Sequence, residues 1–485
     1  MHLNGRLNLA KYGKIVREEI TATHRIVHLF SPKDMKELFA QEGRYPCRRS
    51  HRALLRYRAE RPHLYASGGI FPENGPEWAR LRDTFKRHFL LARNVNAYDR
   101  LVNDITDDLV GYVRRTRSAD TLEVADFQED LYRWALESIC SIMLDARIGC
   151  LGVDLSEESD PSRLIRAAHQ TIHAVMKTEL YSSWQSRDTA DYRELVQGQD
   201  VMAEIVGKHL KTRIRELESG VETDKNGDSL LAQFILNPEI NRKDLFAMIL
   251  DCVLAGIDTT SITASFALYF LARHPQYQER LREEVFQVME RNHVGQQTPQ
   301  QITGKRANKS SVPITLNLLI VFKYFLIAAD HLTSMPWLKA IVKETLRLRP
   351  VSIGVGRLTS TPVEIGGYQV PSNTMIITQN QVSCQQEEYF PQADCFKPER
   401  WMVDRSKAAP ATAQAQAADN RYLWLPFGHG TRMCLGRRIA ELEMYILLCK
   451  VVANFKVEYH HEDIGVKTML INLPDRPMKF KFTDL

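Results

Sequence analysis

Closely spaced cysteine pairs are missing from this sequence. The 485 residues contain eight cysteines, yet no two of them form a C-x-x-C motif and their spacing follows no pattern. This distribution argues against a zinc site and against a disulfide framework. Seven of the cysteines are expected to be small buried apolar residues, which leaves Cys434 as the one candidate for chemistry.

An excess of one charge and a long apolar leader are also missing. The chain has 64 basic and 59 acidic side chains, and its net charge of +5 is too small to indicate nucleic-acid binding. The first 20 residues contain no run that fits a signal peptide or a membrane span, and they lack the Ser-rich, Arg-rich composition of a transit peptide. The chain is therefore either soluble or begins downstream of a targeting segment.

Two segments are atypical. The apolar core of segment 304–330 is 16 residues long, from Ile314 to Ala329, and contains Lys323, whereas a membrane span needs about 20 residues. The segment is a membrane-resting insertion, ordinary core, or a translated intron. We favour the intron as a hypothesis, because a pyrimidine-rich tract encodes runs of Phe, Leu, Ile and Val. Segment 407–420 is low in complexity and predicts a surface loop.

The periodicity of the remaining chain is mainly α-helical. Asn74–Glu77 has the turn and cap chemistry of a helix start. The run from 238 to 274 is apolar nearly all round and predicts a long buried helix. Between 350 and 400, the runs VEIGGYQV and TMIITQNQ are separated by Gly and Pro and predict hairpin strands.

The run FGHGTRMCLG, residues 427–436, combines three glycines with an arginine and a cysteine. Glycine permits unusual backbone angles and lets a flat group approach the main chain. The guanidinium of Arg432 suits a carboxylate. Cys434 precedes a predicted helix, whose N-terminal N–H groups and dipole favour a thiolate. A thiolate beside a carboxylate binder fits a haem iron ligand.

Further motifs accompany this run in a fixed order along the chain. Glu344 and Arg347 lie three apart on one helical face, and Arg400 in PERW can complete a buried network of paired charges. The segment AGIDTT, residues 255–260, lies in the predicted buried helix, and WARLR contains an aromatic and a basic residue on one helical face. With these motifs the chain resembles the cytochrome P450 family from end to end, except in segment 304–330.

The resemblance implies a mainly α cytochrome P450 fold and one catalytic domain over residues 1–485. In this fold a helical prism and a small β-rich lobe enclose haem b between two long helices, and Cys434 is the axial thiolate ligand. The other implied cofactor-binding residues surround the haem and its propionates: Trp78, Arg82, Arg357, Phe427, Arg432 and Gly436. For Arg82 and Arg357, surface salt bridging is the alternative interpretation.

The resemblance also assigns catalytic roles to three residues of the buried helix. Gly256 leaves space where O2 binds, the Thr259 hydroxyl faces that space, and Asp258 relays protons from solvent. The alternative is a kinked core helix in which Thr259 hydrogen-bonds its own turn. An aspartate in an apolar helix is rarely buried without a partner or a purpose, which favours the catalytic interpretation of haem-dependent monooxygenation.

The segments EGRYPCR and CLGRRIAELEM resemble the mitochondrial branch of the family, whose members receive electrons from an adrenodoxin-type ferredoxin. A cationic face suits such an acidic partner, and its expected residues are Lys339, Lys343, Arg437 and Arg438. This branch implies a protein associated with the mitochondrial inner membrane by peripheral contact, and we expect a monomer. No targeting segment is recognisable in this chain.

Finer similarity, in segments such as MIITQNQVSCQ and LPFGHGTRMC, points to arthropod ecdysteroid 22-hydroxylases and a sterol substrate. The expected cavity walls are 63–72, 169–180, 351–355 and 469–473, although each can equally be core. Other sterols or xenobiotics are alternative substrates. An isomerase or peroxide-using enzyme is disfavoured because Asp258 and Thr259 are both present. A non-catalytic haem sensor, and a product inactivated by segment 304–330, are further alternatives.

Overall fold

The computed structural model describes residues 2–21, 24–152, 155–180, 182–219, 229–296, 325–402 and 419–485. Most of the predicted insert and almost all of the predicted loop 407–420 therefore lie outside the described residues. The last part of the insert, 325–330, is described and belongs to the core. Ile327 is fully buried, and its backbone N–H donates to Asn103 Oδ1 at 3.0 Å.

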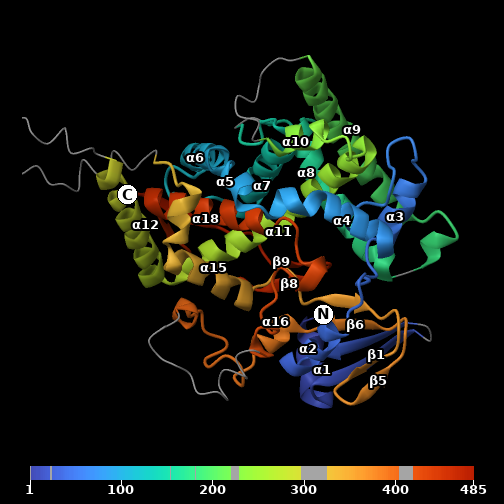
Figure 1. Cartoon of the computed structure of the whole chain (residues 1–485). Helices are drawn as coiled ribbons and strands as arrows, with labels where there is room; N and C mark the ends of the chain where they lie inside the picture. Colours follow the sequence, from blue (N-terminus) through green and yellow to red (C-terminus); the bar gives the residue numbers. More distant parts are fainter. Residues whose placement is uncertain are drawn as a thin grey trace, which may run out of the picture.

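The described part of the chain is mainly α-helical, as predicted (Figure 1). Its helices are α1 (His2–Tyr12), α2 (Pro32–Ala40), α3 (Arg52–Ala59), α4 (Gly75–Leu90), α5 (Ala92–Asn96), α6 (Asp99–Thr116), α7 (Phe127–Leu144), α8 (Asp160–Leu180), α9 (Ala190–Glu218), α10 (Leu230–Leu236), α11 (Arg242–Arg273), α12 (Pro275–Gln296), α14 (Ala329–Thr333), α15 (Pro336–Leu348), α16 (Asn380–Ser383) and α18 (Arg437–Asn454).

The predicted buried helix is α11, which runs through the centre of the helical part (Figure 1). Asn241 caps its start by accepting from Lys243 N at 2.8 Å, and it ends before Pro275, which cannot continue a helix. The helix is long and apolar enough to cross a membrane, but 72% of its most apolar window is buried inside the protein. It packs along α7 and also contacts α18 and α15, so it is the core helix of this domain.

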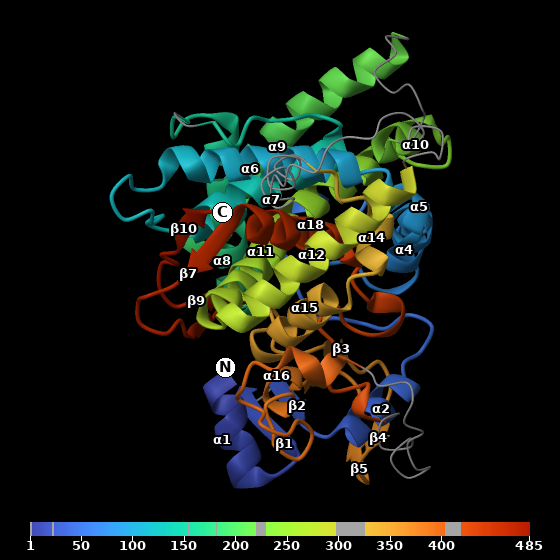
Figure 2. The same cartoon turned by 90° about the vertical axis from the view of Figure 1, so that its left-hand side faces the viewer.

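The strands gather mainly in a lobe at one end of the molecule, together with α1 and α2 (Figure 2). A four-stranded sheet has the order β1-β2-β6-β3, and β4 and β5 form a separate hairpin; two further pairs, β10-β7 and β8-β9, lie nearer the helices. The strands are β1 (Ile15–Thr21), β2 (His24–Leu29), β3 (Gly356–Leu358), β4 (Val363–Ile365), β5 (Tyr368–Val370), β6 (Met375–Thr378), β7 (Phe455–Glu458), β8 (Val466–Thr468), β9 (Asn472–Pro474) and β10 (Lys481–Asp484).

The hairpin predicted in VEIGGYQV is confirmed as β4 and β5. The TMIIT run is a strand, but it does not extend that hairpin. It forms β6, which pairs in parallel with β2, with Val27 opposite Ile376, and in antiparallel fashion with β3. Alternation of polar and apolar residues identifies a strand, whereas its partner depends on contacts that no local pattern contains.

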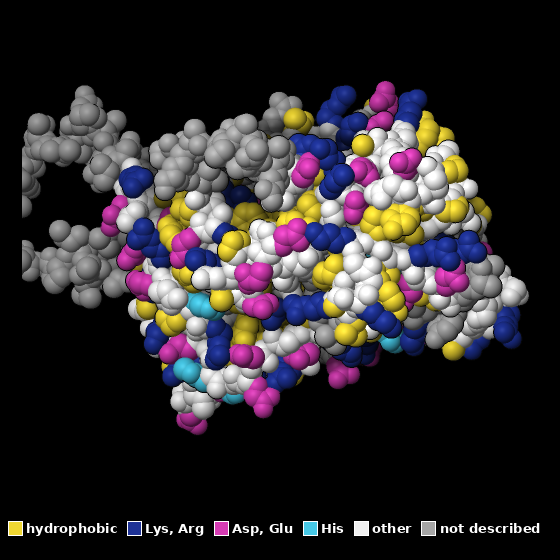
Figure 3. Space-filling view, turned by 90° about the horizontal axis from the view of Figure 1, so that it is seen from below, with side chains coloured by type: hydrophobic (Ala, Val, Ile, Leu, Met, Phe, Trp, Pro, Cys, Tyr) yellow, Lys and Arg dark blue, Asp and Glu magenta, His cyan; other side chains and the backbone are white. Residues whose placement is uncertain are grey.

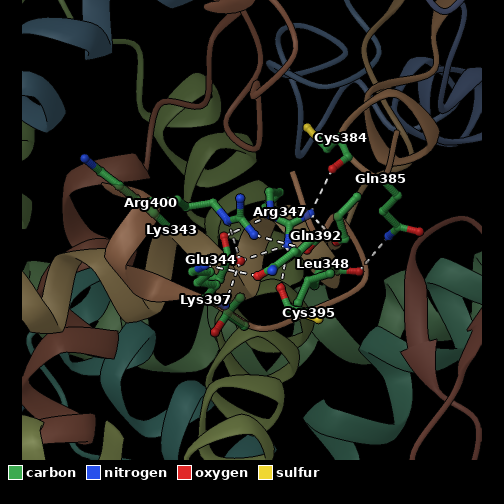
Figure 4. Close-up of polar contacts among 12 residues, drawn as sticks. Lys343, Glu344, Arg347, Leu348, Cys384, Gln385, Gln392, Cys395, Lys397 and Arg400 are labelled. Atoms are coloured by element: carbon green, nitrogen blue, oxygen red, sulfur yellow. Dashed lines mark hydrogen bonds and ion pairs between the residues drawn. The ribbon is translucent and has the colours of Figure 1, made fainter. Parts of the chain in front are cut away.

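The predicted buried charge network is confirmed (Figure 4). Glu344 accepts from Arg347 at 2.8 and 2.9 Å, from Arg400 Nε at 2.9 Å and from Trp401 Nε1 at 2.8 Å. Arg347 also donates to three backbone carbonyls of residues 384, 393 and 395. Because every charge has partners, the network tolerates full burial. The network joins α15 to the segment 384–401, which precedes the cysteine loop in the chain.

Candidate active site

An internal cavity with a volume of about 420 Å³ lies between α11 and the loop before α18. Every predicted site residue except Asp258 lines it. These residues come from α4, α11, β3 and the cysteine loop: Trp78, Arg82, Gly256, Thr259, Arg357, Phe427, Arg432, Cys434 and Gly436. The fold therefore brings side chains from four distant parts of the chain to one cavity.

The cysteine loop has the geometry that its glycines predicted. Gly428 and Gly430 have φ angles of +77° and +65°, which other residues rarely adopt. Cys434 N donates to Phe427 O at 2.8 Å, which closes the loop, and α18 begins three residues later. Burial raises the pKa of Cys434 above its ordinary value, and the N–H of Gly436 and the charges of Arg82, Arg48 and Arg437 oppose this rise in part. The same N–H and positive groups would stabilise the thiolate of a metal-bound cysteine.

Two of the three guanidinium nitrogens of Arg432 donate hydrogen bonds to the protein, and the third has no partner among the described residues. Its Nε donates to Pro46 O at 2.8 Å, and its Nη2 donates to Glu73 O and to Asn74 Oδ1 at 2.8 and 2.7 Å. The guanidinium lies 3.8 Å from the centre of the Trp78 ring. Its Nη1 is buried and has no hydrogen-bond partner among the described residues. A buried donor of this kind is costly unless a ligand accepts from it.

Arg48, Arg82 and Arg357 surround Arg432, and of these Arg48 was not predicted. Burial, with the charges of Arg48 and Arg357, lowers the pKa of Arg432 to about 8. Burial, with Arg357 and Arg82, likewise lowers the pKa of Arg48 to about 10, and Arg48 Nε has no partner among the described residues. Glu42 pairs with Arg357, whereas the Arg82 side chain forms no hydrogen bond or ion pair within the described residues.

This cluster fits the two carboxylates of a haem. Of the four guanidinium groups, only that of Arg357 forms an ion pair within the described residues, with Glu42, so the cluster has an excess of positive charge in a buried place. Two propionates would neutralise most of that excess and accept from the unpartnered nitrogens of Arg48 and Arg432. The cavity extends beside Cys434, and the glycine turn leaves room for a flat macrocycle to approach the main chain. The donor set present is thus that of a haem-thiolate protein.

The opposite wall of the cavity is the AGIDTT segment of α11. Thr259 is exposed to the cavity, and its hydroxyl donates to Ala255 O at 2.7 Å. A Cβ on Gly256 would lie 2.9 Å from Ile139 Cγ1 of α7. Glycine at this position therefore lets α7 and α11 approach each other closely, in addition to lining the cavity.

Asp258 points away from the cavity toward α8. Its Oδ1 lies 2.9 Å from His169 Nε2; the Asp258 side chain is 6% exposed and that of His169 is 35% exposed. Burial alone would lower the pKa of His169, but the hydrogen bond and charge of Asp258, together with Glu129, raise it. The sequence interpretation missed this pairing, although it placed His169 in a predicted wall segment.

The expected walls are partly correct. Ile70 and Phe71 from segment 63–72, four residues of 351–355, and Ile471 from 469–473 line the cavity. The prediction that segment 169–180 forms a cavity wall is wrong, because none of its described residues lines this cavity. The segment belongs to α8, which packs on α9 and meets α11 through the His169–Asp258 pair.

Asn74 is a smaller correction. It is the N-cap of α4, but its side chain makes no cap hydrogen bond. Instead Asn74 Oδ1 accepts from Arg48 N at 2.8 Å and from Arg432. The local cap signal correctly marked the start of the helix, while tertiary contacts redirected the amide to the arginine cluster.

Comparison with known proteins agrees with the donor set. The sequence profile of the cytochrome P450 family matches residues 1–305 and 321–482. "Cytochrome P450 302a1, mitochondrial" of Drosophila melanogaster is 33% identical over 485 residues, which cover 99% of this chain and 88% of that protein. "Probable cytochrome P450 12a5, mitochondrial" of the same species is 30% identical over 483 residues, covering 98% and 82%. Its "Ecdysone 20-monooxygenase" is 27% identical over 482 residues, covering 98% and 81%.

The chain therefore belongs to the cytochrome P450 family, and it is a haem-thiolate monooxygenase of that family. The relatives above are mitochondrial-type insect proteins at about 30% identity. The profile leaves residues 306–320 unmatched, inside the predicted insert. The hypothesis that 304–330 is a translated intron stays a prediction.

Proposed function

We propose that this monooxygenase hydroxylates a sterol of the ecdysteroid type in mitochondria, with haem b ligated by Cys434. The carrying observation is the position of Cys434 in a cavity ringed by Arg48, Arg82, Arg357 and Arg432. A haem with a cysteine thiolate supplies O2 activation, because the thiolate donates electron density to the iron. The protein contributes binding, orientation and protons.

The sterol part of the proposal is supported by two facts. One relative is named for monooxygenation of ecdysone. The cavity wall formed by Ile70, Phe71, Val351, Val355 and Ile471 is apolar, which suits a large ligand with few polar groups. The orientation in which a ligand lies against this wall would determine which of its carbon atoms faces the reactive centre.

This proposal is tested by titrating the haem-loaded protein with ecdysteroid precursors and recording its absorption spectrum. We expect a saturable shift from low to high spin, since a sterol that fills the cavity displaces water from it. Product analysis with ferredoxin, its reductase and NADPH should then show one added hydroxyl. A shift with apolar xenobiotics but with no sterol would contradict the sterol assignment and favour the xenobiotic alternative.

Asp258, Thr259 and His169 are proposed to deliver protons to the cavity. His169 is partly exposed and contacts Asp258, and Thr259 follows Asp258 on the cavity side of α11. A proton can thus enter at the imidazole and pass to the carboxylate. Transfer onward to the Thr259 hydroxyl requires the Asp258 side chain to rotate toward the cavity, because in this structure it points toward α8. The raised pKa of His169 keeps this imidazole protonated over a wider pH range.

An adrenodoxin-type ferredoxin is the proposed electron donor, docking on Lys339, Lys343, Arg437 and Arg438. Burial and the charge of Lys343 lower the pKa of Lys339, against opposing effects of Glu284 and Glu441. The two ammonium groups therefore lie close together without full neutralisation, as an acidic partner requires. Arg438 is exposed directly after the cysteine loop, and Arg437 pairs with Glu441 at 3.0 Å.

Replacing Lys339 and Lys343 together by glutamine is expected to raise the KM for ferredoxin about tenfold at low salt while leaving kcat unchanged. The difference should shrink at high ionic strength, because surface charges are screened. Steady-state kinetics with varied ferredoxin measure both quantities. The control is Lys208→Gln, an exposed lysine on α9, a helix that does not pack on α15 or α18. An equal effect of the control would contradict the proposed docking face.

Mitochondrial location and peripheral contact with the inner membrane complete the proposal. Two of the relatives have "mitochondrial" in their names. Exposed apolar residues occur in the β-rich lobe, among them Leu7 and Tyr12 of α1 and Tyr368 of β5, with exposed fractions of 68%, 59% and 64%. Figure 3 shows this end with small apolar groups among charges of both signs, a composition that suits reversible rather than integral attachment.

A further inference from the structure

The loop of residues 67–73, between α3 and α4, carries two side chains of the cavity wall, Ile70 and Phe71. Its position depends on polar contacts with α11 and α3 in addition to apolar packing. Ile70 N donates to Asp251 Oδ2 at 2.9 Å, and Gly68 O accepts from Arg58 Nη1 at 2.7 Å. The loop is therefore tied on one side to α11 and on the other to α3.

Arg58 and Asp251, the two side chains that hold the loop, also form an ion pair with each other. Arg58 Nη2 donates to Asp251 Oδ1 at 2.6 Å, and each side chain is only 1% exposed. Gly69 lies against the pair with a φ of +83°, and a Cβ there would lie 1.9 Å from Arg58 Nη1 and 2.7 Å from Asp251 Oδ2. The glycine is thus required both by the backbone angle and by the closeness of the ion pair.

A second aspartate of α11 supports the same loop. Asp244 Oδ1 accepts from Ser67 Oγ at 2.7 Å, and its Oδ2 accepts from Arg80 of α4 at 2.7 Å. Asp244 and Asp251 are seven residues apart, two helical turns, and so lie on one face of α11. Asp258 lies two further turns along the same helix. The loop is therefore registered against the helix that carries Gly256 and Thr259.

A buried ion pair contributes little net stability, since apolar side chains of similar volume often stabilise a protein as well or better. Unlike apolar contacts, the pair makes hydrogen bonds of defined direction. Arg58 donates to Gly68 O, Asp251 accepts from Ile70 N, and the two side chains bind each other. Together these hydrogen bonds hold Gly68 and Ile70 in one arrangement. Apolar packing alone would allow the loop several positions of similar energy.

We propose that Arg58 and Asp251 are positioning residues for substrate selectivity: they hold Ile70 and Phe71 in fixed positions in the cavity wall. Asp251 also lines the cavity itself, whereas Arg58 does not, so an effect of Arg58 must act through the loop. A bulky ligand that reaches this wall is then bound in one orientation, whereas a small ligand at the haem does not contact it. This inference rests on the proposed function, because it assumes that the cavity holds haem and ligand.

The test uses two probes that bind haem iron directly, imidazole as the small one and clotrimazole as the bulky one. Arg58→Met and Asp251→Asn are expected to raise the Kd of clotrimazole about tenfold, because the loop no longer presents a preformed wall. The Kd of imidazole should stay unchanged. Optical titration of the haem-loaded variants measures both. An unchanged or lower Kd for clotrimazole in both variants would overturn the proposal.

Two further variants separate positioning from mere stability. Arg213→Met breaks another buried arginine–aspartate pair, with Asp145, whose two partners do not line the cavity; it should lower the melting temperature without changing the ratio of the two Kd values. In a Phe71→Ala background, adding Arg58→Met should change the clotrimazole Kd less than twofold, because the pair acts through a side chain already removed. Full additivity would overturn the proposal.

Failure of the proposed function is distinguishable from failure of this inference. If the wild-type protein binds neither azole and its reduced carbon monoxide complex lacks the thiolate spectrum, the haem assignment is wrong. If the wild type passes both checks and only the variant ratios are unchanged, the assignment of Arg58 and Asp251 is wrong.

Discussion

Replacing Cys434 by serine is expected to abolish both the thiolate spectrum of the reduced carbon monoxide complex and all hydroxylation. Serine is close in size, so the loop closed by Cys434 N and Phe427 O should persist. A neutral hydroxyl, however, cannot replace the electron donation of a thiolate to iron. The measurements are the reduced carbon monoxide difference spectrum, the haem content and the product yield.

Cys252→Ser is the matched control, because Cys252 lines the same cavity from α11. Burial raises the pKa of Cys252 far above its ordinary value, so this thiol remains neutral and its replacement should preserve the thiolate spectrum. If Cys434→Ser kept that spectrum while Cys252→Ser lost it, the ligand would be the thiol on α11, and the proposed orientation of the cavity would be reversed.

Asp258→Asn is expected to lower the rate of product formation about 100-fold, the loss typical of removing a general acid–base group. Binding of substrate should change little, because Asp258 does not line the cavity. Electrons should be diverted to peroxide, since the O2 chemistry would lack its proton supply. Steady-state turnover, peroxide yield and a spectral Kd measure the three effects.

The pH dependence of the same variant gives a second readout. In the wild type, Asp258 and Glu129 raise the pKa of His169, so the imidazole loses its proton only as pH rises above its ordinary range. Without the Asp258 carboxylate, burial dominates and lowers that pKa. The alkaline limb of activity should therefore move to lower pH in Asp258→Asn and flatten in His169→Gln. A profile identical in all three proteins would remove His169 from the proposed relay.

The cysteine loop, the helix after it and the Glu344–Arg347 pair could be predicted from the sequence because each is a local feature. The glycines at 428 and 430 are required by their positive φ angles, and the helix after Cys434 follows from its periodicity. Glu344 and Arg347 are three apart on α15, so their pairing is a local property of a helix. Each of these predictions depends on residues fewer than about ten positions apart.

The residues that were missed have partners far away in the chain. Arg48 joins a cluster with Arg432, whose Nε binds the carbonyl of Pro46 across 386 positions. His169 meets Asp258 across 89 positions, and Arg58 meets Asp251 across 193. No periodic pattern relates such positions, so the arginine cluster, the His169–Asp258 pair and the loop contacts could not be predicted.

The order of residues alone fixed the kinds of group available to this protein: a cysteine in a glycine turn, an acid beside an alcohol in an apolar helix, and arginines placed to bind carboxylates. These follow from short-range geometry, which helix and turn periodicities transmit directly. The tertiary structure determined which arginines share one cavity, that His169 contacts Asp258 of α11, and how the 67–73 loop is held. Those outcomes depend on long-range packing and on the cost of burying an unpaired charge, and both are properties of the whole folded chain.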